Sequence, residues 1–194
     1  MKKIVITISR SYGSGGRELG EKVAQALKID FYDKALIEMM CDETGLDESV
    51  FEQKKPQRIF HFTRLGEMAK LSLNSRIYSL QSDLIKKLAE KSCVIVGRCS
   101  DYILKDDQDA IHIYVYANME DRIKRCINEY HDNEKNIETY IEEVDEVRSN
   151  YYEYFTDRIR GDMNNYDLCI NTSKIGIDAA AKMIVDFIKN EKNK

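Results

Sequence analysis

Apolar and polar positions follow two rhythms along this chain, and together they divide it into short strands and longer helices. Residues 3–8 are mostly apolar and β-branched, without an amphipathic break, which is typical of a parallel strand buried on both faces. Over residues 14–28, Leu19, Val23 and Leu27 recur at every fourth position and predict a helix with one buried stripe. The chain therefore opens with a strand, a short connection and a helix.

The same two rhythms continue to the end of the chain. Short apolar runs predict strands over residues 93–96, 111–115 and 167–170, and we expect a short extended element over residues 30–33. Helical spacing predicts helices over 34–41, 63–90, 118–130 and 176–189. Residues 42–62 are polar and predict short helices and loops. Because strands alternate with helices, the pattern favours an α/β fold with a parallel sheet covered on both faces. Ligands of such sheets bind at the carboxyl ends of the strands.

Composition narrows the class of protein without identifying a function. The 194 residues suffice for one domain with a sizeable core, and 43% hydrophobic with 33% charged residues suits a globular protein. A net charge of −4 and a pI near 5.5 give no support to binding of nucleic acid or of an anionic membrane. We see neither an apolar run of about 18 residues nor a signal peptide, so we expect a cytoplasmic protein.

Three glycines and a serine, residues 13–16, connect the first strand to the first helix. Glycines let the backbone approach an anion closely, and the first amides of the following helix point toward it. The composition therefore favours a phosphate-binding loop, although an ordinary tight strand-to-helix turn would use some of the same residues. The lysine that usually completes such a loop is absent.

Two arginines are candidates for contacts with an anion. Arg98 comes directly after the strand at residues 93–96, and arginine is suited to bidentate phosphate contacts; the alternative is a surface arginine at a strand end. The segment 145–160 mixes arginines with aromatic residues, and Arg148 is our choice for a residue that closes over a phosphoryl group. The alternative for this segment is a solvated helix with local ion pairs such as Asp145 with Arg148.

Other features of the chain leave alternatives open. Arg122 and Arg125 lie one helical turn apart and face either a nucleotide or solvent, with solvent slightly favoured. Tyr151, Tyr152 and Phe155 either stack on a nucleobase or pack internally, and composition favours packing. The long apolar segment 63–90 could support a homodimer or could equally pack on the sheet.

Five stretches, taken in order, make the chain resemble the cytidylate kinase-like family within the P-loop nucleoside monophosphate kinases. They are residues 6–20, 31–34, 95–98, 145–152 and 166–173, and the resemblance covers nearly the whole chain. The set in this order is specific, whereas no single stretch is. The resemblance implies one P-loop domain with a five-stranded parallel sheet, a helical acceptor-binding region at residues 42–90 and a lid at residues 132–162.

The resemblance also implies phosphoryl transfer from ATP, with Mg²⁺, to a pyrimidine nucleoside monophosphate, CMP or dCMP first. The donor nucleotide would be held by Gly13, Ser14, Gly15, Gly16, Arg17 and Glu18. Arg98 would bind the acceptor phosphate, with Asp33 near the acceptor nucleotide, and the lid would contribute Arg148 and Arg158. The implied catalytic residues are Arg17, Arg98 and Arg148.

The chain departs from this family at positions that carry charge. Gly16 stands where lysine is usual, Glu18 where a magnesium-binding threonine is usual, and Val96 where an aspartate supports the metal. Arg17 is the candidate to replace the lysine, and Glu18 or Asp101 the candidate to hold Mg²⁺. Three functions stay open: a kinase of CMP-like nucleotides, a nucleotide- or phosphate-binding sensor without efficient turnover, and a P-loop kinase of another small molecule such as shikimate, gluconate or a coenzyme precursor.

Overall fold

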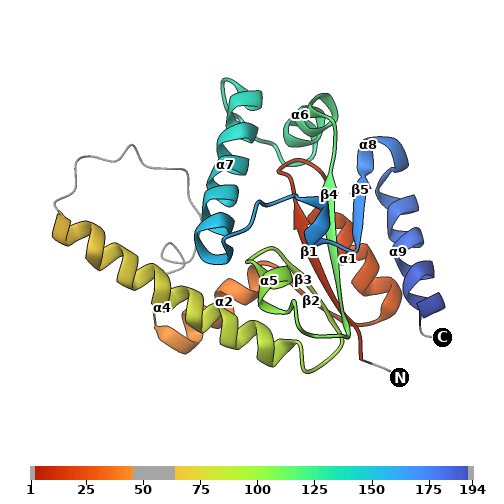
Figure 1. Ribbon diagram of the computed structural model, residues 1–194. Coiled ribbons are helices and arrows are strands. Elements are labelled where there is room, and N and C mark those ends of the chain that lie inside the picture. Colours follow the sequence, from red (N-terminus) through yellow and green to blue (C-terminus); the bar gives the residue numbers. More distant parts are fainter. Residues whose placement is uncertain (1–2, 46–63, 192–194) are drawn as a thin grey trace.

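A five-stranded parallel sheet forms the centre of the computed structural model, which describes residues 3–45 and 64–191 (Figure 1). The strands are β1 (Val5–Arg10), β2 (Asp30–Tyr32), β3 (Cys93–Val96), β4 (Ala110–Tyr116) and β5 (Leu168–Asn171). Their order across the sheet is β2-β3-β1-β4-β5, and every neighbouring pair is parallel. The α/β fold predicted from the alternating pattern is confirmed, and the unbroken apolar run of β1 lies at the centre.

Helices connect the strands. They are α1 (Gly16–Leu27), α2 (Lys34–Thr44), α4 (Arg64–Leu88), α5 (Ser100–Ile103), α6 (Met119–Asn128), α7 (Ile137–Thr156), α8 (Thr172–Ile175) and α9 (Ile177–Glu191), with a short 3-10 helix η1 (Met163–Asn165). The helices predicted from periodicity are present, with ends that differ by a few residues. The prediction of short helices and loops over residues 42–62 falls largely outside the described residues.

One face of the sheet is covered by α1 and α9. Ile6 and Ile8 of β1 belong to a single buried apolar cluster with Leu19 of α1 and Ile184 of α9. Leu19 and Val23 are fully buried, so the stripe predicted for α1 is the face that packs on the sheet. Burial of this stripe removes apolar surface from water and holds α1 against β1.

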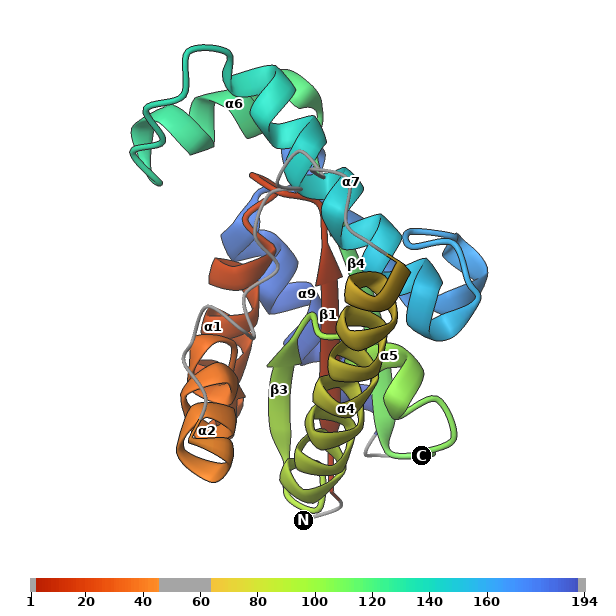
Figure 2. The ribbon, with the colours of Figure 1, turned by 90° about the vertical axis from the view of Figure 1, so that its left-hand side faces the viewer.

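The opposite face of the sheet is covered by α4. Val5 of β1 and Ile95 of β3 cluster there with Ile77, Leu84 and Ile85 of α4. Figure 2 shows α1 and α4 on opposite sides of β1 and β3. These apolar residues of α4 pack within the chain, while the homodimer stays a prediction.

The carboxyl ends of the strands meet at one edge of the sheet, and α6 and α7 lie over this edge (Figure 1). The glycine loop follows β1 at this edge, and Gly97 and Arg98 follow β3. Parallel strands therefore bring together segments that are far apart in the sequence. None of the helices in the described part of the chain is long and apolar enough to cross a membrane.

Candidate functional site

The glycine loop makes a tight turn that requires glycine at two positions. Gly13 and Gly15 have φ angles of +74° and +77°, in the left-handed region that other residues rarely adopt. Gly15 is the N-cap of α1, and its carbonyl accepts the first helical hydrogen bond from Leu19 N at 2.9 Å. Ser14 is fully buried and donates its hydroxyl to the Ser11 carbonyl at 2.8 Å, so its side chain stabilises the turn.

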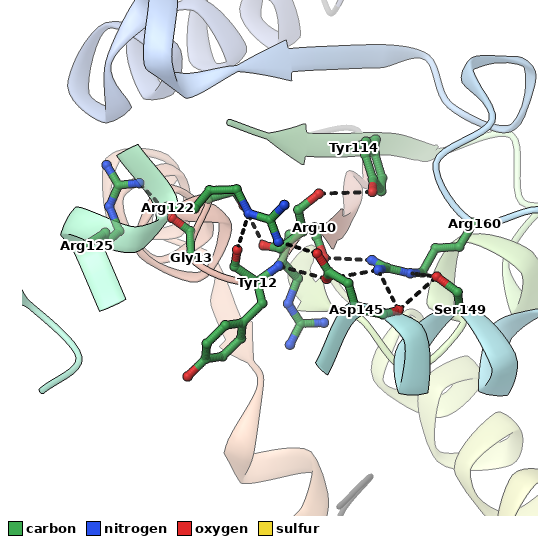
Figure 3. A network of polar contacts seen from close by, with 11 residues as sticks. Arg10, Tyr12, Gly13, Tyr114, Arg122, Arg125, Asp145, Ser149 and Arg160 are labelled. Atoms are coloured by element: carbon green, nitrogen blue, oxygen red, sulfur yellow. Dashed lines mark hydrogen bonds and ion pairs between the residues drawn. The ribbon is translucent and has the colours of Figure 1, made fainter. Parts of the chain in front are cut away.

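Three successive carbonyls of the loop accept hydrogen bonds from side chains behind it. Arg122 Nε donates to Tyr12 O at 2.6 Å, Arg125 Nη1 to Gly13 O at 2.8 Å, and Thr172 Oγ1 to Ser14 O at 2.7 Å. These contacts fix the path of the loop, and Figure 3 shows those of Arg122 and Arg125. Both guanidinium groups hold the loop, and the Arg122 and Arg125 side chains are only 11% and 15% exposed, so the slightly favoured solvent-facing alternative is wrong.

Asp145 of α7 ties this helix to the loop. Its carboxylate accepts from Tyr12 N at 2.9 Å and from the guanidinium groups of Arg122 and Arg160. Arg160 in turn donates to Arg10 O at 2.8 Å (Figure 3). The local ion pair expected between Asp145 and Arg148 is wrong, since the partners of Asp145 come from other parts of the chain. Arg148 is thereby left to point elsewhere.

A cavity of about 600 Å³ opens beside the glycine loop at the carboxyl ends of the strands. Among the described residues, it is lined by one carboxylate, Asp33, and by four arginines: Arg10, Arg17, Arg98 and Arg148. Of the site residues expected from the sequence, the structure brings together Gly13, Gly15, Gly16, Arg17, Asp33, Arg98 and Arg148. The chain carries a net charge of −4, so this local excess of positive charge opposes its overall balance.

Two residues on this cavity are positioned by uncommon local geometry. Arg98 has a left-handed backbone with φ +60°, and its carbonyl accepts from Gln81 Nε2 at 2.8 Å. Asp33 occupies the N-cap of α2 but makes no capping hydrogen bond with its side chain. Instead its carboxylate accepts from Arg17 Nε at 2.7 Å and lies 3.7 Å from Arg10 Nη2. Both residues line the cavity.

Mutual repulsion and burial raise the energy of the charged arginines. Burial, followed by repulsion from Arg148, lowers the pKa of Arg10 to about 9, with Asp33 acting in the opposite direction. Burial also lowers the pKa of Arg148, whose guanidinium lies 5.2 Å from the centre of the Tyr12 ring. An anion between these groups would relieve the repulsion and so be bound favourably. The arrangement is that of an anion site.

Three expected site residues lie away from this cavity. The Ser14 hydroxyl is used within the loop. Glu18 pairs with Lys22 at 3.2 Å, one turn along α1, and does not line the cavity. Arg158 lies over the Tyr102 ring at 5.1 Å and lines a separate cavity. The structure therefore does not place Glu18 or Arg158 where the donor phosphates or a lid contact would need them.

Asp101, the other candidate for magnesium, is also turned away. Its carboxylate accepts a hydrogen bond from the Tyr152 hydroxyl at 2.6 Å, and both residues are buried. Asp101 lines the separate cavity together with Arg158 and His112. Burial raises the pKa of the Asp101 carboxyl above its usual range, and the bond from Tyr152 partly offsets this rise. Tyr152 therefore packs in the interior, which is the alternative that composition favoured over stacking on a nucleobase.

Replacing Tyr152 with phenylalanine should lower the free energy of unfolding by about 1–3 kcal/mol at neutral pH, because a buried carboxylate loses a donor. The lost bond favours the ionised carboxylate, so the variant raises the pKa of Asp101 further in the folded state. The loss should therefore shrink as the pH falls through that pKa. Urea unfolding of both proteins at several pH values measures this, and an equal loss at all pH values would contradict it.

Several residues have structural roles that the sequence analysis did not foresee. Arg10, Arg122, Arg125, Asp145 and Arg160 act through contacts between different segments of the chain. A signal existed for Arg10, since it ends the first strand directly before the loop and strand ends carry ligand contacts. For Arg160 we find no local signal, because nothing near it in the sequence indicates a contact with β1.

Comparison with known proteins agrees with this geometry. Residues 5–174 match the family described as the cytidylate kinase-like family. The crystal structure of an uncharacterized protein from Eubacterium ventriosum is 26% identical, with a TM-score of 0.75 over 96% of this chain and 99% of that chain. A comparison with curated proteins finds no match.

Two shikimate kinases share the fold at lower identity. The enzyme from Acinetobacter baumannii, in complex with shikimate, is 17% identical, with a TM-score of 0.55 over 99% of this chain and 96% of its own. The enzyme from Bacteroides thetaiotaomicron is 11% identical, with a TM-score of 0.58 over 97% of this chain and 99% of its own. At these identities the likeness shows the fold alone and nothing about the acceptor.

Proposed function

Because this chain belongs to the cytidylate kinase-like family, we propose that it transfers the terminal phosphoryl group of ATP to CMP or dCMP. The products would be ADP and the nucleoside diphosphate. The observation that carries the proposal is the cavity beside the glycine loop, where four arginines converge. Phosphoryl transfer brings together two phosphate-bearing substrates, and it is catalysed almost entirely by positioning and by stabilisation of charge.

The cavity offers distinct places for the two substrates. The glycine loop and the start of α1 would hold the donor phosphates, since backbone amides at a helix N-terminus attract anions. Arg98, at the end of β3, would bind the acceptor phosphate, with Asp33 near the acceptor nucleotide. An acceptor phosphate oxygen would attack the terminal phosphorus of ATP as the bond to the ADP oxygen breaks.

Arg148 would act on the group in transfer. It projects into the cavity from α7, the helix that crosses over the loop, and the Tyr12 ring supports its guanidinium. Charge on the transferred group spreads over its oxygens in the transition state, and a positioned arginine stabilises it. Arg17, held by Asp33 at the rim of the cavity, would contact a phosphate from the other side.

The side chains around the cavity include few ligands suited to Mg²⁺. The described residues contain no group of three or more His, Cys, Asp or Glu side chains that could hold a metal ion. Asp33, the one carboxylate on the cavity within the described residues, already accepts from Arg17. Glu18 and Asp101 point elsewhere. The residues present therefore do not fit a protein-held Mg²⁺ site, although kinases of this type use a metal–nucleotide complex.

One observation favours a second candidate, a protein that binds nucleotide without efficient turnover. Position 16 holds glycine where a phosphate-binding loop usually has lysine, and lysine contributes charge to the transition state. Such a protein would keep the anion site and serve as a sensor. The same fold also carries kinases of other small molecules, so the acceptor has to be measured.

The test is incubation of the purified protein with ATP, magnesium and CMP, dCMP, UMP, AMP, GMP or shikimate, with ADP and phosphorylated product both quantified. Samples without acceptor measure background ATP hydrolysis. ADP formation that depends on CMP or dCMP supports the proposal. If no acceptor is phosphorylated while titration calorimetry shows that ATP still binds, the result would favour a nucleotide-binding protein without efficient turnover. Transfer to shikimate alone would show a kinase whose acceptor is not a nucleotide.

A further inference from the structure

The glycine loop lacks the lysine that usually binds phosphate, and an arginine from the preceding strand lies beside it. We infer that Arg10, the last residue of β1, supplies the cation that phosphate-binding loops usually take from the residue after their final glycine. The inference rests on the proposed function, because it assigns the donor-phosphate contact of that same cavity. It concerns Arg10 rather than Arg17, which is next to the vacant position in the sequence.

The spacing of the loop shows an exchange of two residue types. Phosphate-binding loops share the pattern G-x-x-x-x-G-K, in which lysine comes directly after the second glycine. When Gly15 is taken as that second glycine, the first glycine falls at position 10 and the lysine at position 16. This chain has arginine at position 10 and glycine at position 16. Compared with the usual pattern, the positively charged residue stands at the position of the first glycine, and glycine stands at the position of the lysine.

Packing links the arginine at position 10 to the glycine at position 16, because the two positions are in contact. A Cβ atom added at Gly16 would lie 2.7 Å from Arg10 Cβ, which is too close for both side chains to be present without a shift. A Cβ atom added at Gly97 would lie only 2.0 Å from Arg10 Nη1. Two glycines, from different segments, thus leave open the space that the Arg10 side chain occupies.

The environment of Arg10 suits a phosphate contact better than that of Arg17. Arg10 lines the cavity, 21% of its side chain is exposed, and Arg160 holds its carbonyl at 2.8 Å. Its Nη2 lies 3.7 Å from Asp33, which is beyond hydrogen-bond distance. Arg17 is 54% exposed and already donates to Asp33 at 2.7 Å. An anion would be stabilised more by Arg10 than by Arg17, because charge interactions are stronger where water is excluded.

Repulsion around Arg10 supports the same conclusion. Burial lowers its pKa to about 9, and repulsion from Arg148, Arg160 and Arg98 adds to this effect although the Asp33 carboxylate opposes it. An apolar side chain at this position would avoid both the burial of charge and the repulsion, so the guanidinium is costly in the absence of an anion. A bound phosphate would remove the penalty.

The experiment is a set of exchange variants titrated with inorganic tripolyphosphate, which needs no acceptor and no turnover. The proteins are the wild type, R10Q, R10K, G16K, the double variant R10G/G16K, R17A, and R158Q as the control outside the cavity. Calorimetry gives the affinity, and the rise in Tm on adding tripolyphosphate gives a second readout. Transfer by the wild type is measured in parallel.

We expect R10Q to lose at least about tenfold in affinity, as removal of one charged hydrogen-bonding group does, while R10K keeps part of it. R17A should lose less than R10Q, and R158Q should bind like the wild type. G16K should fold poorly or bind weakly, because its side chain meets Arg10. R10G/G16K, in which the lysine has room, should recover affinity relative to R10Q. Recovery would not follow if Arg10 were only a packing residue.

Other outcomes would overturn the inference. R10Q that binds tripolyphosphate as the wild type does, while the wild type transfers phosphoryl groups, removes the role of Arg10 and leaves the proposed function standing. A larger loss in R17A than in R10Q assigns the charge to Arg17. If R10G/G16K folds but binds tripolyphosphate as weakly as R10Q does, a lysine at position 16 does not replace Arg10, and the inferred exchange of roles is wrong. A wild type that binds neither tripolyphosphate nor ATP overturns the proposed function together with the inference.

Discussion

Replacing Asp145 with alanine should lower the free energy of unfolding by about 3 kcal/mol, because it leaves two shielded arginines without their carboxylate. The Arg122 and Arg160 side chains that it pairs with are only 11% and 7% exposed. The change also removes the acceptor for Tyr12 N, so the segment that leads into the glycine loop loses this hydrogen bond to α7. For a chain of this size we expect Tm to fall by roughly 6–12 °C.

Thermal and urea unfolding measure this effect, with E142A as the matched control. Glu142 lies on the same helix but is exposed, so its removal should change stability by no more than about 0.5 kcal/mol. D145N keeps oxygen and loses charge, and it should fall between the wild type and D145A. Equal stability of D145A and E142A would show that the contacts of Asp145 with the loop contribute little.

Replacing Arg148 with alanine should reduce kcat by roughly a thousandfold, as expected for an arginine that stabilises charge on a phosphoryl group in transfer. Arg148 reaches the cavity from α7 and is not paired with Asp145, which has other partners. The substitution also removes a charge whose burial is unfavourable, so folding stability should be maintained or rise.

Steady-state kinetics with the acceptor identified in the panel measure this effect. Because the interaction is strongest in the transition state, kcat should fall far more than KM rises. R148K should retain part of the rate, and R158A, altered in the separate cavity, should behave as the wild type does. An R148A variant with unchanged kcat would remove Arg148 from the transfer step and leave it as part of the binding surface.

The elements of the fold could be predicted because each has its signal within its own residues. The run in β1 and the four-residue spacing in α1 depend on which side chains must be buried, and the structure buries those side chains. The gathering of Arg17, Asp33 and Arg98 also followed from the sequence, because parallel strands end at the same edge of the sheet. The glycines of the loop indicate positive φ angles, and Gly13 and Gly15 have them.

The direction of charged side chains could not be predicted in the same way. Glu18 follows the loop directly, yet it pairs with Lys22 on the outside of α1. Asp145 lies three positions before Arg148, the spacing of a helical ion pair, but its partners are 23 and 15 residues away. Local spacing allows a contact, and the partner with the best geometry in the folded chain decides it.

The sequence by itself determined the parallel α/β fold, the glycine loop and the family, because these depend on periodic burial, on backbone freedom and on motifs in a set order. The tertiary structure alone decided which arginines face the cavity and which hold the loop. Arg122 and Arg125 became supports for the loop, and Arg10 came to lie in the space left by Gly16 and Gly97. The reason is that a long charged side chain has many rotamers of similar energy, and only the surrounding packed elements select one of them.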